Sequence, residues 1–119
     1  MEYTISSKLQ GYITEMREVY MKNEDKFFKY HIYDAFDNIT HDIFGLDYEL
    51  SDPRLDKDAF NACVDIYITD MKRGKALLFT KTYVGPRMMA NGFSASDPLV
   101  RMDTLLTLTT LELENLKIK

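Results

Sequence analysis

The sequence predicts an all-α protein, a small bundle of four main helices with an irregular connection before the last helix. Three observations support this class. Apolar residues recur every three or four positions in four separate segments. Hydrophobic residues make up 45% of the 119 residues, which is enough for a core in a single domain spanning 1–119. Turn-forming residues collect in one long stretch, 84–98.

The first two helices are expected at about 5–22 and 28–43. Each has one apolar face and one polar face, the pattern of a helix packed against a core. Gly45 provides a stop for the second helix, and 47–53 is expected to be a linker. The apolar faces consist of Ile5, Leu9, Tyr12, Ile13, Met16, Val19 and Tyr20 in the first helix, and Phe28, Ile32, Ala35, Phe36, Ile39 and Ile43 in the second.

A third helix is expected at about 58–80, with Gly74 near its apolar face, where a small residue permits close helix packing. An alternative α+β interpretation places a hairpin at about 62–84, because two runs there are rich in β-branched and aromatic residues. The helix is favoured because its stripe keeps one register throughout. That stripe contains Phe60, Cys63, Val64, Tyr67, Met71 and Leu78.

The last helix, at about 97–116, is capped by Ser96 or Asp97 and has Pro98 in its first turn. It carries two apolar stripes on roughly opposite sides, and such a helix must be covered on both. We therefore expect a homo-oligomer; the alternative is a central helix wrapped by the other three. The stripes are Leu99, Met102, Leu106, Thr109, Leu113 and Leu116, and Val100, Leu108 and Leu111.

The charges are distributed unevenly along the chain. All 19 acidic residues lie outside 71–96, whereas that segment holds five cations, although the whole chain has a net charge of −4. A basic segment in an acidic protein is where an anionic ligand or an acidic partner would dock. The candidate binding residues lie in or next to the connection at 80–101 and are Lys81, Tyr83, Arg87, Asn91, Phe93, Ser94, Ser96 and Arg101.

These residues predict a non-enzymatic binding protein of the inhibitor, adaptor or sequestering type, acting through the 80–101 connection. One alternative is a receptor for a nucleotide-like small anion at a subunit boundary. Another is a metal-dependent hydrolase that uses the polar face of the second helix, because histidine and carboxylate side chains one turn apart can share a divalent metal. That face carries His31, Asp34, Asp37, His41 and Asp42.

Other classes are disfavoured by composition. The pI near 5.1 argues against general binding to duplex nucleic acid, and no cofactor motif is present. The single cysteine, Cys63, is expected to be a small core residue in a reducing compartment. We expect a cytoplasmic protein, because no segment is typical of a signal peptide or a membrane span.

Overall fold

The first and the last described helix begin next to residues whose side chains cap them. The computed structural model describes residues 5–81 and 97–118. These form α1 (Ser7–Lys22), α2 (Glu24–Lys29), α3 (Tyr33–Ile43), α4 (Leu46–Leu50), α5 (Lys57–Lys81) and α7 (Pro98–Leu116). The side-chain oxygen of Ser6 accepts a hydrogen bond from an amide in the first turn of α1, and that of Asp97 accepts one from an amide in the first turn of α7. Amides in the first turn have no hydrogen-bond partner within their own helix. The all-α prediction is confirmed, since the described residues contain helices and no strand.

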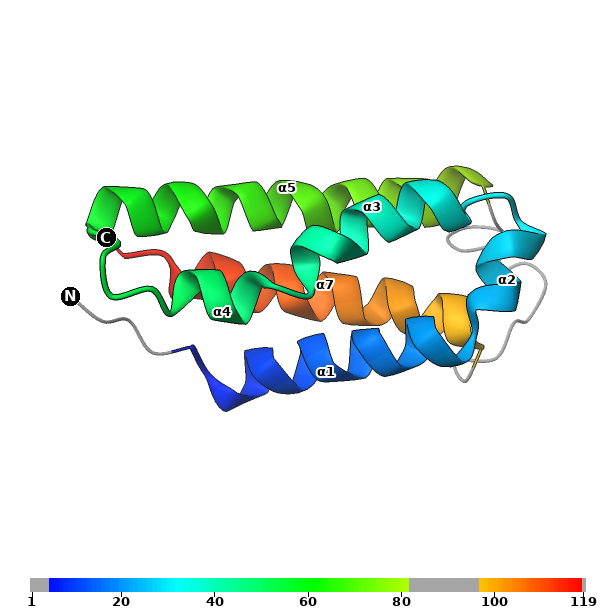
Figure 1. The fold of residues 1–119 in the computed structure, drawn as a ribbon, viewed down its shortest axis with the longest axis horizontal. Helices are drawn as coiled ribbons and strands as arrows, with labels where there is room; N and C mark the ends of the chain where they lie inside the picture. The colour runs from blue at the N-terminus through cyan, green and yellow to red at the C-terminus, as the bar shows by residue number, and fades with distance from the viewer. Residues whose placement is uncertain (1–4, 82–96, 119) are drawn as a thin grey trace.

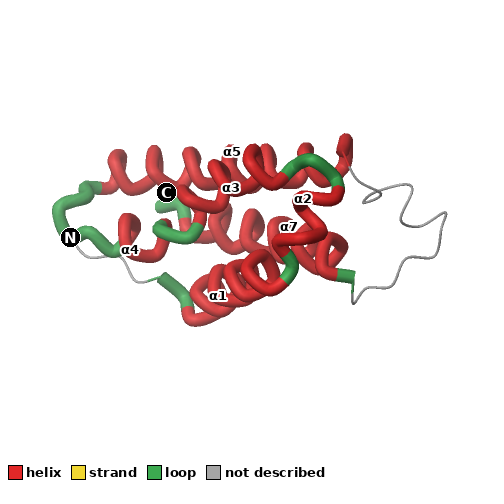
Figure 2. The backbone as a smooth tube through the Cα atoms, turned by 45° about the vertical axis from the view of Figure 1, so that its right-hand side comes forward, coloured by secondary structure: helices red, strands yellow, loops and turns green. Residues whose placement is uncertain are grey.

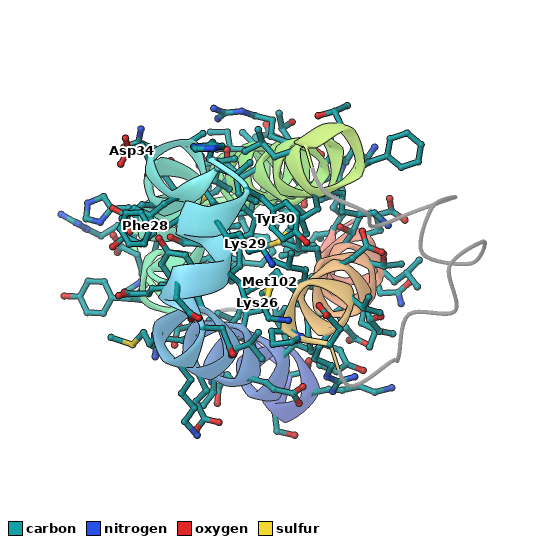
Figure 3. The ribbon with its side chains drawn as sticks, turned by 90° about the vertical axis from the view of Figure 1, so that its right-hand side faces the viewer. Lys26, Phe28, Lys29, Tyr30, Asp34 and Met102 are labelled. Atoms are coloured by element: carbon teal, nitrogen blue, oxygen red, sulfur yellow. The ribbon has the colours of Figure 1, made fainter. Side chains whose placement is uncertain are left out.

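The long helices lie side by side along the 47 Å axis of the molecule (Figure 1). α7 packs against both α1 and α5, and α3 packs against α5. Figure 2 shows the same bundle turned, with α2 toward one end and α4 toward the other. Viewed along the bundle in Figure 3, α7 and the α3–α4 limb lie on opposite sides of the core, with α1 and α5 between them.

The predicted second helix is broken, and its register differs from the prediction. His31 has a φ of 59°, in the left-handed region that a non-glycine residue rarely adopts, and it separates α2 from α3. The core residue of α2 is therefore Phe27, which is fully buried, and not Phe28, which is 56% exposed. Ala35 is also exposed, whereas Phe36 is buried as expected.

The expected linker at 47–53 is partly helical. Leu46 and Leu50 are fully buried and four residues apart, so they share the face that α4 turns to the core. The alternative hairpin at 62–84 is wrong for the described residues, because α5 continues without a break through Lys81. The expected connection therefore begins after Lys81 and not at Thr80.

Gly74 provides a close approach between three helices, as predicted. A Cβ added to Gly74 would lie 3.2 Å from Cδ1 of Leu106 and 3.6 Å from Cε2 of Phe36. The first distance is shorter than an ordinary carbon–carbon contact, which is near 3.5–4.0 Å. Glycine thus allows α5 to approach α7 and α3 at the same point.

α7 buries most of its apolar surface against α1 and α5. Its main stripe is buried apart from Leu116, which is half-buried. The second stripe is covered unevenly: Val100 is buried, Leu108 is half-buried and Leu111 is 52% exposed. The bundle therefore covers part of the second stripe by itself, and Leu111 remains on the surface. Within the described residues, no helix combines the length and apolarity needed to cross a membrane.

Candidate functional site

The predicted 80–101 connection starts and ends at the end of the bundle formed by α2, which we call the α2 end. α5 finishes there with Lys81, and α7 starts there after Asp97 (Figures 1 and 3). The part of the site that the structure describes is Lys81, as the last residue of α5, and Arg101. The remaining candidates lie outside the described residues; they are Tyr83, Arg87, Asn91, Phe93, Ser94 and Ser96.

Arg101 has a structural partner in another helix. Its Nε donates a hydrogen bond to the carboxylate of Glu15 in α1, and this bond raises the pKa of Arg101. The Arg101 side chain is still 40% exposed, and a guanidinium has five N–H donors. Arg101 can therefore tie α7 to α1 and still present donors to a partner.

The N-terminus of α7 is occupied by a carboxylate of the protein. Oδ1 of Asp97 accepts from the amide of Leu99 at 2.9 Å, and Oδ2 accepts from Nζ of Lys26 at 3.1 Å. Asp97 thus fills the position that an anion would take at a helix N-terminus. This placement weighs against a small anionic ligand at that point.

Two other cations of the basic segment are also paired. Nη1 of Arg73 lies 3.2 Å from Oδ1 of Asp70, and Nζ of Lys75 lies 4.0 Å from Oδ1 of Asp103. Lys72 is exposed and makes no ion pair with any described residue. The charge asymmetry of the sequence is therefore partly neutralised by carboxylates that the fold brings close.

The α2 end also carries exposed aromatic rings, which the sequence did not indicate. Phe28 stacks on Tyr33 with ring centroids 3.9 Å apart, and Nζ of Lys29 lies 5.8 Å from the centroid of Tyr30 (Figure 3). Phe79, near the end of α5, is 55% exposed. Phe28 was assigned to the core because the helical register was continued through His31.

The polar face of the second predicted helix does not gather a metal centre. Asp37 accepts a hydrogen bond from the buried hydroxyl of Tyr20 at 3.1 Å, while Asp34 and His41 are exposed on α3. Burial and this bond raise the pKa of Tyr20. In the part of the chain that the structure describes, no three His, Cys, Asp or Glu side chains are placed to hold a metal ion.

A hollow of about 600 Å³ lies at the opposite end of the bundle, between α4, the 51–55 segment and α5. Cys63 is part of its wall and is half-buried, not enclosed in the core as expected. Burial, and secondly the nearby carboxylate of Glu49, raise the pKa of the Cys63 thiol. A thiol that resists ionisation is a poor nucleophile. No sequence pattern indicated this hollow, since its residues come from three segments.

Comparison with known proteins gives no relative: no family model, no curated protein and no solved structure matches this chain.

Proposed function

We propose that this protein is a non-enzymatic binding protein that engages an acidic protein partner with its α2 end. The observation that carries the proposal is the meeting of two features there. Both ends of the basic connection lie at this end, and so do two large exposed rings, Phe28 and Phe79. Interfaces are enriched in aromatic and arginine side chains, and a few such residues supply most of the binding free energy.

A protein partner is favoured over a small anion by the pairing of the cations. Arg101 is bound to Glu15, Lys26 is bound to Asp97, and Asp97 occupies the N-terminus of α7. A small anion would have to compete with these carboxylates at one point. An extended partner can instead contact exposed rings and the remaining cations over a wider area.

The test begins with native mass spectrometry of the protein purified from its own cells, which reports a bound subunit or small molecule by mass. Binding of that partner is then measured by calorimetry for the wild type and for Arg87→Ala, Arg87→Glu, Arg101→Glu, Phe93→Ala and Phe28→Ala. Lys57→Glu is the control, because Lys57 is exposed at the far end of the bundle. We expect Arg87→Ala to weaken binding about tenfold or more and to change stability by less than about 1 kcal/mol.

The pattern of losses distinguishes the alternatives. With a protein partner, Phe93→Ala should weaken binding as much as Arg87→Ala. With a small anion, Arg87→Glu and Arg101→Glu should show the largest losses, and these should grow at low salt. If all of these variants bind as tightly as Lys57→Glu, the 80–101 connection is only a connector and the proposal is wrong.

A further inference from the structure

The hollow between α4 and α5, which we call the α4–α5 hollow, has the size of a ligand site. Its volume of about 600 Å³ falls in the range of about 300–1,000 Å³ typical of small-molecule pockets. Its lining residues come from α4, the 51–55 segment and the first part of α5, and Figure 1 shows these elements at the end of the bundle away from α2. It is therefore separate from the surface proposed above for a protein partner.

Some of the hydrogen-bond donors around this hollow are already used within the protein. Arg54 holds Asp52 with two nitrogens, Nε at 3.0 Å from Oδ1 and Nη2 at 2.8 Å from Oδ2. These bonds lower the pKa of Asp52 to about 2, so the two charges cancel at neutral pH. The Ser51 hydroxyl donates to the carbonyl of Asp47 at 2.6 Å. A ligand that takes donors from Arg54 would have to share them with Asp52.

Glu49 is the group in the wall whose charge is not balanced. Its carboxylate accepts a hydrogen bond from the hydroxyl of Tyr67, which is buried beneath it. Among the described residues no cation pairs with Glu49. A carboxylate has about four acceptor positions, so one bond from a tyrosine leaves capacity for a donor that carries positive charge.

Glu49 is exposed, and part of the wall beside it is apolar. The ring of Tyr48 is 86% exposed, and Leu55 and Cys63 pack against the core from the same hollow. An aromatic face attracts a cation through its quadrupole, and the apolar wall would cover a hydrocarbon body. The wall thus offers a negative charge, an aromatic face and an apolar floor.

We propose that the α4–α5 hollow binds a small organic ammonium ion with an apolar body. The ammonium group donates to Glu49 and lies against the ring of Tyr48. The apolar body rests on Leu55 and covers the thiol of Cys63. A carboxylate ligand is excluded by Glu49, and a neutral ligand of the same shape loses the charge-assisted hydrogen bond.

The single cysteine of the chain provides the assay. Modification of Cys63 by a neutral aromatic disulfide reagent is followed in the presence of phenethylamine, phenethyl alcohol or phenylacetate. These three probes share a ring and differ in charge. We expect phenethylamine to slow the modification saturably, the alcohol to need about tenfold higher concentration, and phenylacetate to have no effect. Amide NMR spectra of the unmodified protein measure the same binding without the thiol.

Glu49→Gln should raise the phenethylamine concentration needed for half-protection about tenfold, while glutamine still accepts the hydrogen bond from Tyr67. Glu18→Gln is the matched control, because Glu18 is exposed on α1, and it should leave that concentration unchanged. Tyr48→Ala, at an exposed position, should also weaken protection and tests the site if Glu49→Gln fails to fold. Equal protection by the amine and the alcohol, protection by phenylacetate, or no spectral change with any probe would overturn the proposal.

Discussion

Two adjacent phenylalanines of α2 give a sharp test of the fold at the α2 end. Phe27 is fully buried, and its ring centroid lies 4.9 Å from those of both Tyr20 and Phe36. Truncating a buried phenylalanine to alanine costs about 3–5 kcal/mol, and the two ring pairs account for about 0.5–1.5 kcal/mol each. Phe28 is 56% exposed with one stacked partner, Tyr33, so Phe28→Ala should cost about 1 kcal/mol or less.

The free energy of unfolding of both variants is measured by urea denaturation followed by far-UV circular dichroism. The pair is its own control, because the two substitutions are chemically identical and one residue apart. Equal losses, or a larger loss for Phe28→Ala, would mean that the helical register continues through His31 as the sequence suggested. The expected result also makes Phe28→Ala a suitable variant for binding experiments, since its fold is preserved.

Two further predictions concern the interior and the outer face. Asp70 is buried, and its Oδ2 has no hydrogen-bond partner among residues 5–81 and 97–118. Burial, followed by the charge of Asp42, raises the pKa of Asp70. The native state therefore binds the Asp70 proton more tightly than the unfolded state does. At pH values between the ordinary pKa of an aspartate and the raised pKa of Asp70, the free energy of unfolding should therefore fall as the pH rises. Asp70→Asn should lose this pH dependence in urea denaturation between neutral and acidic pH; an unchanged profile would contradict the assignment. We also expect the wild-type protein to sediment as an oligomer at micromolar concentration. The double substitution Leu108→Glu and Leu111→Glu should give monomeric or insoluble protein. A wild-type monomer would refute the predicted oligomer.

The fold could be predicted from the sequence where a helix carries one continuous stripe of apolar residues. The buried faces of α1 and α5 follow the predicted spacing of three and four, because packing against a core selects that period. The break at His31 could not be predicted, because a positive φ at a histidine is imposed by the turn between two packed helices and has no local signal. Because the helical register of α3 was continued back through His31, the sequence analysis assigned Phe28 to the core in place of Phe27.

The site was harder to predict, because charge along the chain differs from charge in space. Glu15 lies 86 residues before Arg101, yet the antiparallel packing of α1 against α7 pairs them. The hollow beside Cys63 depends on α4, a helix of five residues that looked like a linker. Sequence spacing records neighbours on one helix, whereas both of these features depend on contacts between helices.

The paired cations also bear on how the α2 end would bind. Coulomb attraction between exposed charges weakens with salt, and it mainly accelerates the encounter of two partners. Arg73 and Lys75, two of the five cations in 71–96, already face carboxylates of the protein, and so does Arg101 next to that segment. The net field of the segment is therefore smaller than its five cations would give. Most of the lifetime of a complex must then come from desolvating rings such as Phe28 and Phe79. Charge would guide the partner to the α2 end, and the aromatic side chains would hold it there.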